Sequence, residues 1–173
     1  NEHVDRVVEA AIAAMRDAGA VIVDPVRIPS HDKLEAGEYD VLLHEFKAGL
    51  DAYLRALPAA LPVHSLADVI AFNERHAAEE MRWFGQEHML AAQKKGPLTD
   101  PGYRAALARN HRLSRAQGID AALAAHRLDA LVAPTGSPAW PTDYVNGDHY
   151  GGSCSQMPAV AGYPHVTEIG RAH

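Results

Sequence analysis

The chain has 173 residues, of which 47% are hydrophobic and only 6% aromatic, and its formal net charge is -6 at pH 7. This length and hydrophobic content suffice for a real core and argue against disorder. Because the lysines and arginines are dispersed over an acidic chain, we expect no nucleic-acid partner. No apolar run reaches the roughly 18 residues of a membrane span, so we expect no membrane partner either. The single cysteine, Cys154, fits a reducing compartment and a cytoplasmic location.

The first part of the chain has the pattern of a helix followed by a buried strand. Apolar residues recur at helical spacing from Val4 to Met15, and Gly19 ends the pattern as a C-terminal cap would. The β-branched run at 20–29 closes with prolines and predicts a short buried strand. A second amphipathic face, at 39–57, predicts another helix.

Two further helices follow in the middle of the chain. Ser65 and Asp68 have the spacing of a capping box and predict the start of one long helix over 65–95. Asp100 followed by Pro101 is typical of an N-cap with proline at the first helical position. The helix that starts there is predicted to reach about residue 126, with a break near Gly118.

The last part of the chain contains a long loop between two apolar segments. Residues 128–135 predict a second buried strand, 155–163 a small-residue helix, and 165–169 a third strand. Between them, prolines and glycines crowd the loop at 134–152, and loops of this length are often functional. Ligands bind beyond the carboxyl ends of strands in open α/β sheets, so this loop is a candidate binding site, although a surface connection is an equally good interpretation.

Ser153 lies in a glycine-flanked bend, as a nucleophile often does, and two interpretations of it are open. The sequence around it lacks the closing glycine of a nucleophile elbow, and no strand precedes it. A serine that caps the following helix is the simpler interpretation. His76 and Glu80 share a helical face at a spacing that fits a metal, but a solvated polar face explains them more simply, so we expect no metal site.

Five segments, taken together and in this order, resemble the C-terminal half of the amidase signature family, and within it the peptide-amidase-like branch. They cover nearly the whole chain, and the last two are the most specific. The segments are "EFKAGLDAYL" (45–54), "SLADVIAFNERHAAEE" (65–80), "FGQE" (84–87), "GIDAALAAHRLDALVAPTGSPAW" (118–140) and "AVAGYPHVT" (159–167).

The resemblance implies an α/β fold, a mixed β-sheet flanked by helices, present here as a partial amidase-signature domain. Residues 1–173 would be the C-terminal portion of that single domain, with the N-terminal catalytic portion absent. The family hydrolyses carboxylic amides through a lysine and two serines, without a cofactor, and nothing in this chain matches the two segments that carry them. The sequence also departs from the family after residue 164, where Glu168 falls in the third predicted strand.

By the resemblance, this chain supplies no catalytic residue, and Ser153 lies at the rim of the substrate cleft. Thr135, Trp140, Ser153 and Gln156 match cleft-forming positions and are the expected substrate contacts. The expected partners are a small-molecule or peptide amide, possible C-terminal peptide amides included, and the missing N-terminal half of the same enzyme. Exposed apolar surface would make the isolated chain, inactive by itself, self-associate.

Two other classes of function stay open from the sequence. The chain could be a self-sufficient serine hydrolase that uses Ser153, in which case replacing this serine would abolish activity. It could also be a non-catalytic helical interaction module, which would be a stable monomer without any amide cleft.

Overall fold

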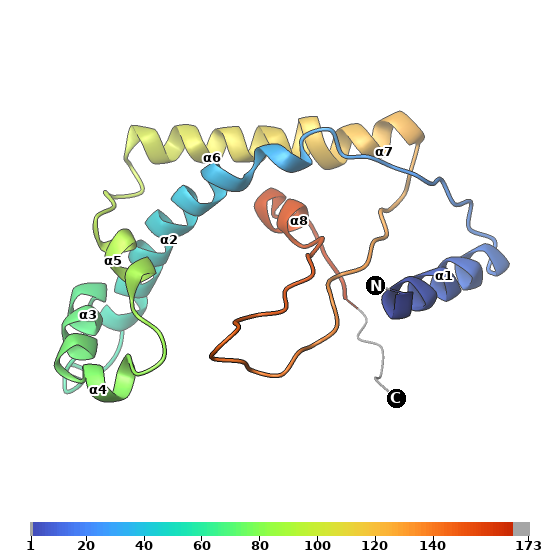
Figure 1. Ribbon diagram of the computed structural model, residues 1–173. Helices are drawn as coiled ribbons and strands as arrows, with labels where there is room; N and C mark the ends of the chain where they lie inside the picture. Colours follow the sequence, from blue (N-terminus) through green and yellow to red (C-terminus); the bar gives the residue numbers. More distant parts are fainter. Residues whose placement is uncertain (1, 168–173) are drawn as a thin grey trace. The chain divides into compact units, whose positions relative to one another are not determined.

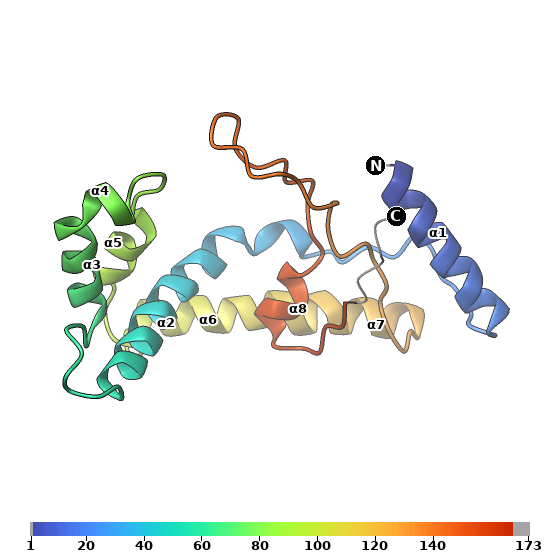
Figure 2. The same ribbon diagram turned by 90° about the horizontal axis from the view of Figure 1, so that it is seen from below.

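Helices make up most of the secondary structure of this protein (Figures 1 and 2). The structure is a computed structural model that describes residues 2–167, except for the side chains of Glu35 and Ala36. The described part of the chain divides into two compact units, unit 1 formed by residues 2–34 and 111–167 and unit 2 by residues 35–110. The elements in chain order are α1 (Glu2–Asp17), η1 (His31–Lys33), α2 (Glu35–Arg55), α3 (Leu66–Arg75), α4 (Ala77–Glu80), α5 (Glu87–Gln93), α6 (Pro101–Ser114), η2 (Arg115–Ile119), α7 (Asp120–His126) and α8 (Gln156–Ala161).

Unit 2 is a small helical assembly in which α2, α3 and α5 pack against one another (Figure 1). Leu66 is fully buried, and Leu43, Ile70 and Ala92 join it in one apolar cluster. Burying a leucine side chain contributes about 1.5–3 kcal/mol, so this cluster stabilises the packing of α2, α3 and α5. The Ser65 hydroxyl accepts a hydrogen bond from the Asp68 N–H at 3.2 Å, which confirms the predicted start of α3.

The single long helix predicted over 65–95 is wrong, because the chain forms α3, α4 and α5 with a break after each of the first two. His76 ends α3, and its ring stacks on Phe72 with 4.2 Å between the ring centroids. The His76 Nδ1 also lies 2.9 Å from the Phe72 carbonyl oxygen. A side chain folded back onto its own helix explains His76 without a metal, and the described residues contain no group of three potential metal ligands.

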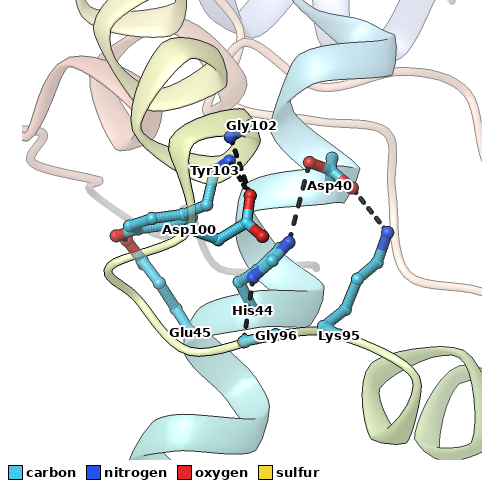
Figure 3. A network of polar contacts seen from close by, with 8 residues as sticks. All are labelled: Asp40, His44, Glu45, Lys95, Gly96, Asp100, Gly102 and Tyr103. Atoms are coloured by element: carbon cyan, nitrogen blue, oxygen red, sulfur yellow. Dashed lines mark hydrogen bonds and ion pairs between the residues drawn. The ribbon is translucent and has the colours of Figure 1, made fainter.

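A polar network ties α2 to the segment between α5 and α6 (Figure 3). Lys95 Nζ donates to Asp40 Oδ1 at 2.6 Å, and the buried His44 donates through Nδ1 to the Gly96 carbonyl oxygen at 3.2 Å. Lys47 Nζ donates to the carbonyl oxygens of Gln93 and Lys95, both at 2.9 Å. The Lys47 ammonium group thus binds carbonyl oxygens at the end of α5 that have no partner within the helix.

The start of α6 is anchored in the same network (Figure 3). Asp100 Oδ1 accepts hydrogen bonds from the N–H groups of Gly102 and Tyr103 at 2.7 and 3.3 Å, so the predicted N-cap is confirmed. The Tyr103 hydroxyl donates to Glu45 Oε1 at 2.7 Å. This hydrogen bond, with burial, raises the pKa of Tyr103, because the carboxylate disfavours a phenolate beside it.

Unit 1 has its own core around the end of α6, η2 and α8. Leu34, Leu113, Ile119, Met157 and Ala161 form one buried cluster. The helical run bends at Gly118, whose φ and ψ of -117° and -108° are non-helical, so the predicted break is confirmed.

A buried serine satisfies the carbonyl groups around this bend. Ser30, which is 2% exposed, donates to the carbonyl oxygens of Leu113 at 2.6 Å and Gln117 at 3.0 Å. The wide turn of η2 interrupts the regular hydrogen-bond ladder, and Ser30 supplies a donor from a distant part of the chain.

The first helix, α1, is confirmed as predicted from its apolar periodicity, and Gly19 follows it at a φ of +95°. None of its residues is buried. The predicted apolar face is therefore left half-exposed in the described part of the chain. None of the described helices is both long and apolar enough to cross a membrane.

The predicted α/β fold with a mixed β-sheet is wrong for the described residues. Residues 20–29 and 128–135 contain no strand, and a single antiparallel bridge joins Gly136 to Ser153. Residues 165–167 form no strand either, while the rest of the third predicted strand, with Glu168, lies outside the described residues. A β-branched run favours an extended backbone locally, but a strand also needs a neighbouring chain to complete its hydrogen bonds.

Candidate functional site

The long loop between α7 and α8, drawn in orange in Figure 1, is closed at its base by main-chain contacts. The Cys154 N–H donates to the Thr135 carbonyl oxygen at 3.2 Å, beside the bridge between Gly136 and Ser153. The Gly151 N–H donates to the Ser137 hydroxyl at 3.2 Å. The loop base therefore brings two predicted site residues, Thr135 and Ser153, close together although 18 positions separate them in the sequence.

The contacts of Ser153 are with a second serine. Its Oγ lies 2.7 Å from the Ser155 Oγ and accepts a hydrogen bond from the Ser155 N–H at 3.1 Å. Within residues 2–167, no histidine, lysine or carboxylate is hydrogen-bonded to this hydroxyl. A serine nucleophile needs an adjacent base, so the geometry does not favour Ser153 as the attacking group.

The expected cap on α8 also differs in detail from the structure. The Ser153 hydroxyl accepts its hydrogen bond from the N–H of Ser155, which precedes α8, and not from an N–H within α8. Ser155 occupies the N-cap position and makes no capping hydrogen bond with its side chain. The half-buried Gln156 is the first residue of α8.

Trp140 lies further out along the loop, where it is held by residues of the returning limb. Its Nε1 donates to Asp148 Oδ1 at 3.2 Å, and its ring meets Tyr150 edge-on with 6.5 Å between centroids. At the turn, the Asp143 carboxylate accepts hydrogen bonds from the N–H and side-chain amide of Asn146 and from the N–H of Val145. These hydrogen bonds lower the pKa of Asp143. These contacts give the loop tip a defined conformation.

A cavity of about 820 Å³ lies in unit 1 beside the loop base. This volume falls within the range of small-molecule sites, which is about 300–1,000 Å³. Thr135 and Cys154 line the cavity, whereas Trp140, Ser153 and Gln156 are not among its lining residues. Its walls are mostly apolar and include Val26, Ile28, Ile119, Leu123, Leu131, Val132, Met157 and Val166.

Polar side chains that the sequence did not single out as a site also line this cavity. Arg27, His31 and Asp129 contribute charge or titratable groups, and Cys154 Sγ lies 3.9 Å from His165 Nε2. Nothing in the sequence pattern links these positions. Arg27 and His31 lie about a hundred positions before Asp129 in the sequence, and only the fold brings the two groups together.

Tyr163, also at the cavity, is tied to α7. Its hydroxyl donates to Asp120 Oδ1 at 2.9 Å, and this hydrogen bond is the main cause of the raised pKa of Tyr163. Arg115 lies over the same ring, 5.7 Å from the centroid, and its Nε donates to the Ala161 carbonyl oxygen at 2.7 Å. These contacts position the end of α8 against the cavity wall.

Comparisons with known proteins identify relatives of this chain. No family profile matches the chain. A solved structure of peptide amidase with the competitive inhibitor chymostatin superposes with a TM-score of 0.84 and 45% identity, over 91% of this chain and 32% of its own. Native peptide amidase from Stenotrophomonas maltophilia gives a TM-score of 0.81 and 44% identity, over 91% of this chain and 31% of its own. The chain belongs to the amidase signature family.

A curated relative leads to the same family. An Arabidopsis thaliana protein named as a probable amidase is 33% identical over 160 residues, which are 90% of this chain and 28% of that protein. The chain therefore spans about a third or less of the length of these amidases. The resemblance found in the sequence motifs is confirmed.

Proposed function

We propose that this chain is the C-terminal part of an amidase that hydrolyses carboxylic amides, including C-terminal amides of peptides. The observation that carries the proposal is the 45% identity and TM-score of 0.84 to peptide amidase over 91% of the chain. Identity at this level over nearly all of the described fold supports a common activity, and not the fold alone.

The proposed reaction runs through an acyl-enzyme. A serine hydroxyl attacks the amide carbonyl carbon, the C–N bond breaks as ammonia or an amine leaves with a proton, and water then releases the acid. A neutral lysine and a second serine move the protons, and backbone N–H groups stabilise the oxyanion. We place this lysine and both serines in the part of the enzyme outside this chain.

Two of the four lysines of this chain, and Ser153, support that assignment. Within unit 2, Lys47 binds carbonyl oxygens at the end of α5, and Lys95 binds the carboxylate of Asp40 in α2. Ser153 bonds to Ser155 instead of a base. A self-sufficient hydrolase built on Ser153 is therefore the weaker alternative, and a non-catalytic module is weaker still because of the identity to peptide amidase.

Thr135, Trp140, Ser153 and Gln156 are proposed as substrate contacts. Thr135 has the most direct support, since it lines the cavity and lies at the loop base beside Ser153. Trp140 offers an exposed part of its ring, steadied by Asp148, to an apolar group of a substrate. The amide is the proposed substrate and the N-terminal part of the enzyme the proposed partner.

The test is ammonia release from a panel of primary amides, including a C-terminally amidated peptide. The purified chain and its Ser153→Ala variant are compared at equal concentration. We expect no release above the buffer blank from either protein. Release by the chain that the variant lacks would overturn the proposal and make Ser153 the nucleophile.

A further inference from the structure

The loop between α7 and α8 presents two aromatic rings beside an exposed carboxylate. Trp140 is half-buried and Tyr150 is 65% exposed, and their rings meet edge-on with 6.5 Å between the centroids. The Trp140 Nε1 donates to Asp148 Oδ1 at 3.2 Å, which holds the carboxylate at the edge of the indole ring. We call Trp140, Asp148 and Tyr150 the loop cluster.

The Asp148 carboxylate still has an oxygen to offer. Within the described part of the chain, its hydrogen bond is the one from Trp140, and no lysine, arginine or histidine forms an ion pair with it. Asp143, the other carboxylate of this loop, is occupied by the turn itself. Val145 and Asn146 donate their N–H groups to its Oδ1, and the Asn146 amide donates to its Oδ2. Only Asp148 is therefore placed to bind a group from outside the loop.

The chain does not supply a cation to the loop cluster. The other tryptophan, Trp83, has Arg82 over its ring at 5.0 Å from the centroid, whereas no cation lies over Trp140 within the residues that the structure describes. Between residues 128 and 170 the sequence has no lysine or arginine, and its residues that are charged at pH 7 are all acidic. A cation at the loop cluster would therefore come from a bound molecule.

A lysine or arginine side chain matches the chemistry of the loop cluster. Its hydrocarbon stem packs along apolar surface while its charged head stays in water, so the stem would be the apolar group on the Trp140 ring. Tryptophan is also the aromatic side chain that attracts cations most strongly. Asp148 adds a charge-assisted hydrogen bond to the head. An uncharged side chain would gain the contact with the rings and nothing from the carboxylate.

We infer that the loop cluster is a subsite for a lysine or arginine side chain of the substrate. This inference rests on the proposed function, in which Trp140 contacts the substrate, and it adds the substrate class, which is peptide amides that contain a basic residue. It also assigns Asp148 and Tyr150, which no sequence motif singled out, as specificity-determining residues.

Binding of short peptide amides to the purified chain tests the inference. The first probe is acetyl-alanyl-lysine amide. Two control peptides replace the lysine, one by norleucine, which keeps the stem without the charge, and one by lysine acetylated on its side chain. The readout is the indole N–H signal of Trp140 in nitrogen–proton correlation spectra of the labelled chain. The chain has two tryptophans, and Trp83→Phe assigns their signals.

We expect the lysine peptide to shift the Trp140 signal and to bind at least about fivefold more tightly than either control peptide. Asp148→Asn should remove this preference, because asparagine keeps an oxygen for the Trp140 N–H but carries no charge. Asp143→Asn is the matched control, since it removes the same charge from the same loop, and it should leave the preference within about twofold. Tyr150→Leu removes the second ring and should weaken the lysine peptide by about twofold or more.

Equal affinities for the three peptides, or no shift of the Trp140 signal with any of them, overturn the inference. Equal losses in the Asp148 and Asp143 variants also overturn it, because the effect is then the general negative charge of the loop. If Asp148→Asn displaces the Trp140 signal of the free chain, the loop itself has changed, and the three peptides on the unsubstituted chain decide.

This binding measurement does not depend on hydrolysis. Failure of the proposed amidase activity would appear only in tests of ammonia release, and it would leave a measured preference for lysine standing. Loss of that preference, in turn, would overturn the subsite and leave amide hydrolysis as proposed.

Discussion

Replacing Gly118 by alanine tests the packing at the bend between α6 and α7. An added Cβ would lie 2.5 Å from the Leu113 carbonyl oxygen, 2.7 Å from Met157 Cε and 3.1 Å from Ser30 Oγ. The methionine end can move, but the carbonyl oxygen belongs to the backbone of the same helical run. Overpacking a core costs about 1–3 kcal/mol, and we expect a value of about 2–3 kcal/mol here because backbone has to shift.

The assay is thermal and urea unfolding followed by circular dichroism. A chain of this size loses roughly 2–4 °C in Tm for each kcal/mol, so Gly118→Ala should lower Tm by about 4–12 °C. Gly136→Ala is the control in the same unit, because the nearest atom to its added Cβ is the Gly152 carbonyl oxygen at an ordinary 3.5 Å. Equal unfolding midpoints for the two variants would refute the reasoning from these contacts.

Three further predictions concern unit 2. An added Cβ at Gly37 would clash with the buried Asn110 Oδ1, so Gly37→Ala should destabilise the chain by about 1–3 kcal/mol in urea unfolding. Gly49→Ala, whose added Cβ has nothing within 4 Å, should stabilise it by up to about 1 kcal/mol, and the opposite order would contradict this. Ser65→Ala removes the cap of α3 and should cost about 0.5–2 kcal/mol in the same assay, and an unchanged midpoint would count against the cap. Hydrogen bonds from the His64 N–H and the Ser65 hydroxyl lower the pKa of Asp68 below 3.8, so its carboxylate stabilises the folded chain above pH 3.8. This stabilisation is lost as the pH falls through the lowered pKa. Asp68→Asn should remove this part of the acid dependence of unfolding, and an unchanged acid profile would disprove it.

Family membership could be predicted from sequence because the evidence for it lies in contiguous motifs. The segments at 118–140 and 159–167 identified the amidases before any fold was considered, and the comparisons confirm that family. Thr135 was expected at a substrate cleft and lines the cavity in unit 1. His165 and Asp129 were missed at that cavity, since neither belongs to a spacing pattern with a known chemistry. The substrate roles of Thr135, Trp140, Ser153 and Gln156 all stay predictions.

The sequence by itself determined where α1 ends and where α3 and α6 begin. Asp100 with Pro101, Ser65 with Asp68, and Gly19 act through hydrogen bonds and backbone angles within a few residues, so a local pattern is enough to predict them.

Whether an extended segment forms a strand, and how distant segments pack, was decided only by the tertiary structure. A run of valines at 20–29 was read as a strand, yet a strand depends on a neighbouring chain, and the described residues provide none. The bond from Ser30 to Leu113 spans 83 positions, and the Tyr163 hydroxyl reaches Asp120 across 43. Such contacts bend the helical run and shape the cavity, and they follow from how distant segments pack, which no local pattern contains.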